Sequence, residues 1–274
     1  MRLAISNIAW DVSEDEDVCE LIHRYGIDAI DVAPSKYFSD PAKASDREVT
    51  RVRNWWSRRG IEITGMQSLL FGSRGMNVFS TASLQEEMLN YLSRVCRIGA
   101  GLGGTRLVFG SPRNRDRSGL TEQDANDIAA AFFRRLGNIA EAHGVLVCLE
   151  PTPARYGGNF MTTTAETAKV VGLVASSAIK MQMDTGSMAL NGEDPIATLG
   201  RFADLIGHVH ASEPDLLPLG DGITDHEKVH AALERYLPTQ LVSIEMLATK
   251  NEPHLVSIER AIKVACEYYR AAEA

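Results

Sequence analysis

Four side chains that can bind a metal ion or transfer a proton stand at the ends of short apolar runs: Glu150, Asp184, His210 and Glu245. Successive members of this set are 34, 26 and 35 residues apart. The first run, GVLVCLEPTP over residues 144–153, is typical of a strand buried on both faces. A carboxylate at the end of such a strand is costly to bury unless a partner compensates its charge. Each of these carboxylates therefore needs a partner.

The chain alternates between strand-like and helix-like segments from end to end. Apolar runs predict strands at residues 3–8, 27–33, 61–66, 105–110, 145–149, 179–184, 205–211 and 241–245. Amphipathic patterns predict helices at residues 13–25, 46–59, 83–98, 121–143, 164–174, 195–202, 225–236 and 254–269. A capping box at residues 13–16 is expected to open the first helix, and Gly26 to end it.

Strands that alternate with helices pair in parallel through right-handed crossovers. Eight such units in 274 residues favour a closed (β/α)8 TIM barrel over a doubly wound sheet. We therefore predict a single α/β barrel domain over residues 1–274.

In such a barrel the chemistry lies at the carboxyl ends of the strands, where the four side chains from strands five to eight would meet. Three carboxylates directed at one point repel one another, and a divalent cation removes that repulsion. Oxygen ligands with one imidazole suit Mn, Mg, Co or Zn. Taken singly, each residue could be a polar strand end with its own local hydrogen bonds. Four on successive strands instead indicate a site for one divalent metal ion.

Five segments carry a resemblance to a known family: LEPTP (149–153), MDTGSMAL (183–190), GHVHASEPD (207–215), LPLGDG (217–222) and SIEML (243–247). Over essentially its whole length the chain resembles the xylose-isomerase-like TIM barrel superfamily, the sugar phosphate isomerase/epimerase family. This family includes sugar isomerases, ketose 3-epimerases, hydroxypyruvate isomerase, inosose dehydratase and endonuclease IV. By resemblance, one metal would be bound by Glu150, Asp184, His210 and Glu245. Glu150 and Glu245 would be the catalytic acid–base pair.

The resemblance implies a metal-dependent isomerase or epimerase of a sugar or sugar-like keto compound. A metal bound to a carbonyl and its neighbouring hydroxyl acts as a Lewis acid and stabilises the enediolate that proton loss leaves. A glutamate that holds the metal through one oxygen keeps the other free to take the proton. Return of a proton from Glu150 or Glu245 to the opposite face gives epimerisation, and return to the adjacent carbon gives isomerisation. The sequence leaves both open.

Two positions depart from the epimerase pattern. Ser187 stands where those enzymes carry a substrate-binding histidine, three residues after the metal-binding aspartate. Leu216 stands where they carry an arginine, six residues after the histidine ligand. A standard ketohexose epimerase is therefore disfavoured, and so is endonuclease IV, whose three-metal site needs further histidines. An inosose-dehydratase-like lyase and a non-catalytic sugar-binding barrel stay open as alternatives.

Further side chains are expected around the substrate: Arg113, Gln67, His208 and Ser187. The guanidinium of Arg113, after strand four, could hold a phosphate or carboxylate. Gln67, after strand three, could bind a hydroxyl group. His208 lies two residues before His210 and so on the same face of the strand. We expect it to be a stacked or supporting histidine rather than a fifth ligand.

Composition limits the compartment and the partners. The net charge of −8 argues against nucleic acid or an anionic membrane as the main partner. No run approaches the ~18 apolar residues of a membrane helix. The scattered cysteines are typical of free thiols in the cytoplasm. We expect a cytoplasmic protein with a small sugar or polyol-derived substrate, and leave a homo-oligomer open.

GAGLGG (99–104) satisfies G-x-G-x-x-G, but it follows a helix and precedes a strand, so we interpret it as a helix end and a turn.

Overall fold

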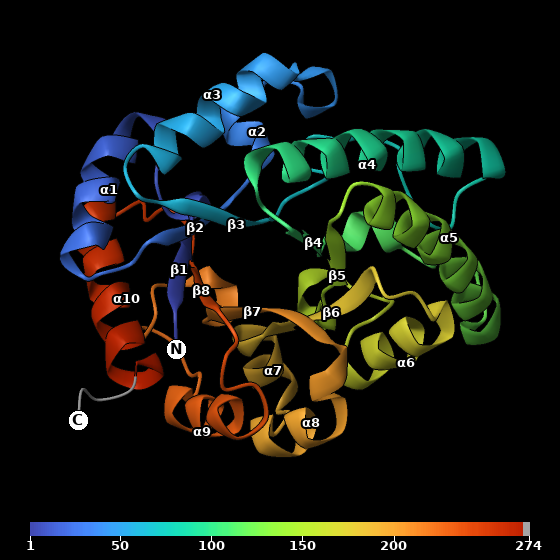
Figure 1. Ribbon diagram of the computed structural model, residues 1–274. Helices are drawn as coiled ribbons and strands as arrows, with labels where there is room; N and C mark the ends of the chain where they lie inside the picture. Colours follow the sequence, from blue (N-terminus) through green and yellow to red (C-terminus); the bar gives the residue numbers. More distant parts are fainter. Residues whose placement is uncertain (271–274) are drawn as a thin grey trace.

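The computed structural model describes residues 1–270 and contains a closed barrel of parallel strands with helices around it (Figure 1). The strands follow one another around the barrel in chain order: β1 (Leu3–Ser6), β2 (Ala29–Val32), β3 (Glu62–Met66), β4 (Arg106–Phe109), β5 (Leu146–Leu149), β6 (Ile179–Asp184), β7 (Ile206–Ser212) and β8 (Val242–Glu245). Strand β8 pairs with β1 and closes the barrel. The predicted (β/α)8 fold is confirmed, and the strand ends lie within two residues of the predicted ones.

The helices form the outer layer of the molecule (Figure 1). They are α1 (Asp15–Arg24), α2 (Pro34–Tyr37), α3 (Asp46–Ser57), α4 (Ala82–Leu102), α5 (Glu122–Ala142), α6 (Thr164–Val174), α7 (Thr185–Asn191), α8 (Pro195–Phe202), α9 (His226–Tyr236) and α10 (His254–Tyr269). Their apolar faces join the strands in one buried core, where Phe109 of β4 stacks edge-to-face on Phe133 of α5. Between residues 1 and 270, no helix has the length and apolar character to cross a membrane.

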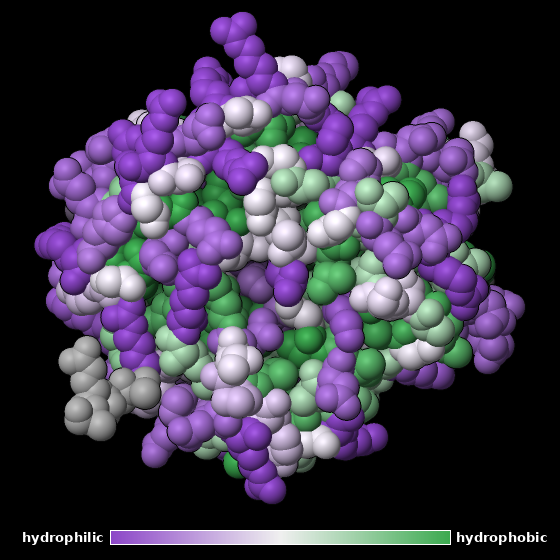
Figure 2. All heavy atoms as spheres, viewed as in Figure 1, coloured by the Kyte–Doolittle hydropathy of each residue, from purple (hydrophilic) through white to green (hydrophobic). Residues whose placement is uncertain are grey.

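The outer surface has the opposite character. Hydrophilic side chains cover most of the face shown in Figure 2, and apolar side chains show mainly in the hollows between them. This division places the apolar side chains of the strands and of the inner helix faces out of water, which is the main favourable contribution to folding.

The parallel register determines which strand-end residues face each other. Asp184 of β6 stands opposite His210 of β7. Ser212 of β7 stands opposite Glu245 of β8. Side chains alternate along a strand, so His210 and Ser212 lie on the same face. The register therefore brings two carboxylates and one imidazole to the same end of the barrel.

Two predicted local signals were wrong. The capping box lies at residues 11–14 and not at residues 13–16. The Glu14 carboxylate accepts the Asp11 amide at 2.8 Å, and a short 3-10 turn then leads into α1. Helix α4 does not end at residue 98 but continues to Leu102, so that Gly99 is helical. A Cβ on Gly99 would lie 2.9 Å from the Leu107 side chain, so the glycine allows α4 to pack closely against β4.

Candidate metal centre

The four strand-end side chains that the sequence singles out come together at one end of the barrel. Glu150 directly follows β5, and His210 lies near the end of β7. Asp184 and Glu245 are the last residues of β6 and β8. Each offers one ligand atom, and these atoms all lie within 4.8 Å of one another. One cation with ligand distances of about 2.0–2.6 Å could contact all four.

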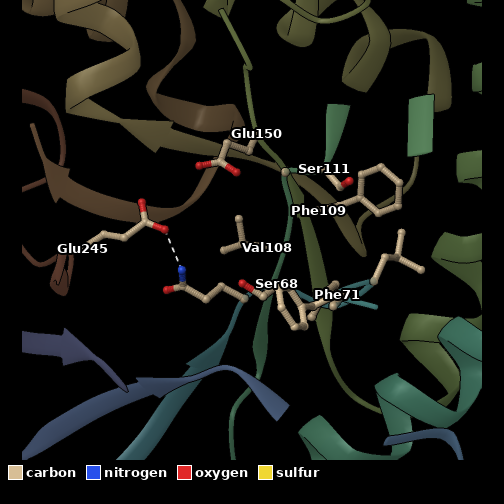
Figure 3. A pocket seen from close by; sticks show the side chains of 11 residues that line it. Ser68, Phe71, Val108, Phe109, Ser111, Glu150 and Glu245 are labelled. Carbon is tan, nitrogen blue, oxygen red and sulfur yellow. Dashed lines mark hydrogen bonds between the residues drawn. The ribbon is translucent and has the colours of Figure 1, made fainter. Parts of the chain in front are cut away.

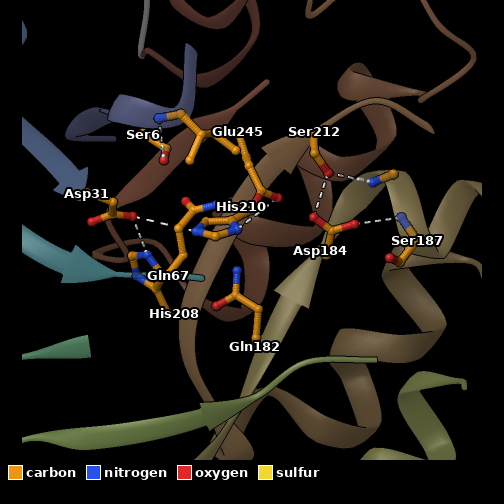
Figure 4. Close-up of polar contacts among 12 residues, drawn as sticks. Ser6, Asp31, Gln67, Gln182, Asp184, Ser187, His208, His210, Ser212 and Glu245 are labelled. Atoms are coloured by element: carbon orange, nitrogen blue, oxygen red, sulfur yellow. Dashed lines mark hydrogen bonds and ion pairs between the residues drawn. The ribbon is translucent and has the colours of Figure 1, made fainter. Parts of the chain in front are cut away.

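Asp184 is fixed by a short helix that the sequence did not predict. Helix α7 begins directly after β6, and Asp184 is its N-cap residue. Its Oδ1 accepts the Ser187 amide at 2.7 Å, and its Oδ2 accepts the Ser212 hydroxyl at 2.7 Å (Figure 4). Each carboxylate oxygen has two lone pairs, so both oxygens can still accept a further ligand. The contacts therefore orient the carboxylate without blocking it.

His210 is fully buried between two carboxylates. Its Nδ1 lies 3.1 Å from Glu245 Oε2, and its Nε2 lies 3.5 Å from Asp31 Oδ2 (Figure 4). Within residues 1–270 neither ring nitrogen has a well-formed hydrogen bond. Nδ1 can therefore bind a metal while Nε2 faces Asp31, the arrangement in which a carboxylate fixes the tautomer of a histidine ligand.

Asp31 on β2 is not among the site residues predicted from the sequence. Its Oδ2 bonds to His208 Nε2 at 2.7 Å, and its Oδ1 accepts the Thr64 hydroxyl at 3.0 Å. The ring centroids of His208 and His210 are 5.0 Å apart in an edge-to-face contact. Asp31 and the two histidines form a second group that could hold a cation. The available signal was an aspartate within an otherwise apolar strand.

Glu150 occupies space that a side chain at position 110 would otherwise fill. Gly110 directly follows β4, and a Cβ there would lie 1.7 Å from Glu150 Oε2. Nearby, Arg115 is 1% exposed and contacts the Thr152 hydroxyl. Among the described residues, two of its guanidinium nitrogens have no partner. The charge of Arg115 acts to lower the pKa of Glu150. Neither Gly110 nor Arg115 was singled out from the sequence as a neighbour of Glu150.

The charges of the cluster do not balance. Burial, followed by the charges of Glu245 and Asp184, raises the pKa of Glu150 to about 8. Burial and the charge of Glu245 raise the pKa of Asp184 to about 6. Burial would also raise the pKa of Glu245, but the charge of His210 lowers it. The cluster is thus short of positive charge, and a divalent cation would supply it.

A cavity of about 250 Å³ lies against the two glutamates. It is lined by residues 67–71 after β3 and by residues 108–111 around the end of β4. Figure 3 shows the carboxyl groups of Glu150 and Glu245 facing this space, with Phe71 and Val108 around it. Gln67 Nε2 donates to Glu245 Oε1 at 2.5 Å. The cavity is smaller than the ~300–1,000 Å³ of drug-sized sites, which suits a small polar molecule.

The residues predicted to bind substrate do not all reach this cavity. Gln67 lines it. Ser187 contacts Asp184 through its amide, and His208 is buried against Asp31. Arg113 lines a neighbouring groove instead. Contact of these four side chains with a substrate stays a prediction.

Comparison with known proteins identifies the family. The family model of the xylose isomerase-like TIM barrel matches residues 19–271. The chain belongs to this family. Solved structures similar to this chain include that of a D-psicose 3-epimerase from Clostridium cellulolyticum H10 with D-tagatose. Its TM-score is 0.82, with 15% identity over 99% of this chain and 100% of that chain. An L-ribulose 3-epimerase structure has a TM-score of 0.81 and 19% identity over 98% of this chain and 94% of that one. At these identities the likeness shows the fold.

Curated relatives match over shorter segments. The inosose dehydratase of Clostridium beijerinckii is 32% identical over 86 residues, which is 31% of this chain and 28% of that protein. The inosose dehydratase of Bacillus thuringiensis is 26% identical over 102 residues, 37% of this chain and 33% of that protein. The chain thus matches about a third of the length of these relatives.

Proposed function

We propose that this protein is a divalent-metal-dependent isomerase or epimerase of a sugar or sugar-like keto compound. The observation that carries the proposal is the convergence of four ligand atoms, from Glu150, Asp184, His210 and Glu245, within 4.8 Å of one another. The whole-length likeness to sugar 3-epimerases supports the class of substrate.

The donor set fits a divalent metal. It contains three carboxylates and one imidazole, a combination that suits Mn, Mg, Co or Zn. The buried His210 Nδ1 has no hydrogen-bond partner among residues 1–270, and the carboxylates repel one another. A bound cation would supply positive charge that stabilises the negative charge developing on the substrate oxygens as a proton leaves.

The two glutamates have the properties of an acid–base pair. Their carboxyl groups face each other in Figure 3. Each glutamate can hold the cation through one carboxylate oxygen and keep the other oxygen free to accept or return a proton. Glu245, oriented by Gln67, would take the substrate proton, and Glu150 would return one from the other side. In the reverse direction the roles exchange.

Solvent exchange tests this proposal. The purified protein, loaded with Mn²⁺, is incubated in D₂O with D-fructose, D-tagatose and a keto-inositol, and the products are analysed by NMR and mass spectrometry. We expect carbon-bound deuterium without loss of water. The Glu245→Gln variant should lose about 10²–10⁴-fold in rate, whereas the exposed control Glu87→Gln on α4 should not change. Wild-type exchange rates in Glu245→Gln would refute the proposed roles.

A second candidate is a lyase of the inosose dehydratase kind, which the matches to inosose dehydratases favour. It would use the same cluster and the same proton-abstracting glutamate, followed by departure of a hydroxyl group. The same experiment separates the two reactions, because a lyase releases one water from the keto-inositol.

A further inference from the structure

A second and larger groove adjoins the cavity at the glutamates. Its volume is about 810 Å³, and it lies between the loop after β3 and the segment after β4. Leu70, Phe71 and Ser111 line both the cavity and the groove, so the two spaces adjoin each other. A molecule whose reacting carbons lie at the glutamates could therefore extend into the groove.

Two arginines give the groove a positive charge. Arg74 lines it from the β3 loop and Arg113 from the β4 segment, and both are exposed. The lining residues, all of them within the described part of the chain, include no aspartate or glutamate. Between residues 1 and 270 neither arginine forms a salt bridge, in contrast to Arg260, which pairs with Asp221. In a chain with a net charge of −8, this is a local region of opposite sign.

The walls of the groove are tied together by hydrogen bonds. The side chain of Asn114, which is 6% exposed, donates to the Met76 carbonyl at 2.7 Å. The Val78 amide donates to the Asn114 carbonyl at 2.9 Å. Asn77 Nδ2 donates to the Asp116 carbonyl at 2.9 Å. These contacts hold the two arginine-bearing segments beside each other before any ligand arrives, which lowers the entropic cost of binding.

From this geometry we infer that the groove binds an anionic group, a carboxylate or a phosphate, at the far end of the substrate. Arg74 and Arg113 contact its oxygens while the reacting carbons lie between Glu150 and Glu245. Guanidinium groups suit both kinds of anion, because they offer paired donors to carboxylate and phosphate oxygens. This inference rests on the proposed function and narrows its substrate class from neutral sugars to keto sugars that carry an acidic group.

Matched pairs of probes test the inference. Deuterium exchange is measured with the Mn²⁺-loaded protein on neutral D-fructose, on D-fructose 6-phosphate and on the keto acid 5-keto-D-gluconate. We expect kcat/KM to be at least about tenfold higher for one of the two anions than for D-fructose, chiefly through KM. The probe with the larger advantage identifies phosphate or carboxylate as the group. The double variant Arg74→Gln/Arg113→Gln should remove most of this ratio, whereas Arg47→Gln on α3 should leave it unchanged.

Direct binding measurements show whether the anion site in the groove or the proposed reaction is wrong. The affinity for inorganic phosphate and for malonate is measured by calorimetry on the same variants. If no probe exchanges but the double variant still loses anion binding at least about tenfold, the groove stands and the reaction is wrong. An unchanged anion affinity in the double variant, or equal kcat/KM for neutral and anionic probes, would overturn the groove assignment.

Discussion

The substitution Gly110→Ala tests whether the Glu150 carboxylate must keep its exact position for metal binding and catalysis. In Gly110→Ala the new carbon would lie 1.7 Å from Glu150 Oε2 and 2.9 Å from its Cδ. Since Cβ contacts under 3.0 Å are essentially never found, Oε2 must retreat by roughly 1.3 Å unless the backbone moves. Metal–ligand distances tolerate only ~0.2 Å, and a misplacement of about 1 Å in a reacting group can cost ~100-fold in rate.

We therefore predict that Gly110→Ala weakens Mn²⁺ affinity by at least about tenfold and slows solvent exchange by about 100-fold. Calorimetric titration with Mn²⁺ measures the first effect without any need for substrate, and NMR in D₂O measures the second. Gly172→Ala in α6 is the matched control, because a Cβ there meets nothing within 4 Å. It should keep the wild-type affinity and rate.

A folded Gly110→Ala protein with the Mn²⁺ affinity and exchange rate of Gly172→Ala would contradict the proposed role of Glu150. Circular dichroism and thermal melting would show that both variants fold. In that case the carboxylate of Glu150 would not be needed at the place where the structure has it, and its role as ligand and proton carrier would be lost.

Three further predictions concern the support of the site and the stability of the fold. Asp31→Asn removes the charge next to His210, the proposed metal ligand, and should weaken Mn²⁺ affinity about 10–100-fold by calorimetry; an unchanged affinity contradicts the supporting role. Burial alone would raise the pKa of Glu213, but hydrogen bonds from His226, Thr224 and Gly220 hold it at about 2. Because this pKa is below the unfolded value of 4.5, the carboxylate stabilises the fold above about pH 5 by up to about 3 kcal/mol, and this contribution is lost as the pH falls toward 2. In urea titrations the stability difference between wild type and Glu213→Gln should therefore shrink as the pH falls through that range. A difference that stays constant would argue against the stabilising role of the Glu213 carboxylate. Mn²⁺ at 100 times its dissociation constant should stabilise the protein by about 2.7 kcal/mol and raise its melting temperature by several degrees; no shift, or one that EDTA does not reverse, counts against a bound ion.

Much of the site could be predicted because it depends on topology more than on side-chain detail. Glu245 is the last residue of β8, and Glu150 directly follows β5. The ends of successive parallel strands meet in a barrel, so the spacing along the chain was enough to bring them together. The same argument applied to Asp184 and His210, which lie on the two strands between them.

The residues that contact the proposed ligands could not be predicted in this way. Asp31 lies on β2 and its partner His208 on β7, and no local pattern links positions 177 residues apart. The contact between Gly110 and Glu150 depends on how two side chains share space at neighbouring strand ends. Arg113 was recognised as a cation near the catalytic end, but its place in the adjoining groove depends on loop geometry, which the sequence pattern does not specify.

The proposed function requires that one divalent ion binds among the four strand-end side chains. The most direct measurement is a titration of the metal-stripped protein with Mn²⁺, followed by electron paramagnetic resonance and calorimetry, on wild type and on Asp184→Asn. We predict a single bound ion per chain in the wild type and a loss of affinity of at least about 100-fold in the variant. No bound Mn²⁺ in the wild type, or the same affinity in Asp184→Asn, would contradict the claim.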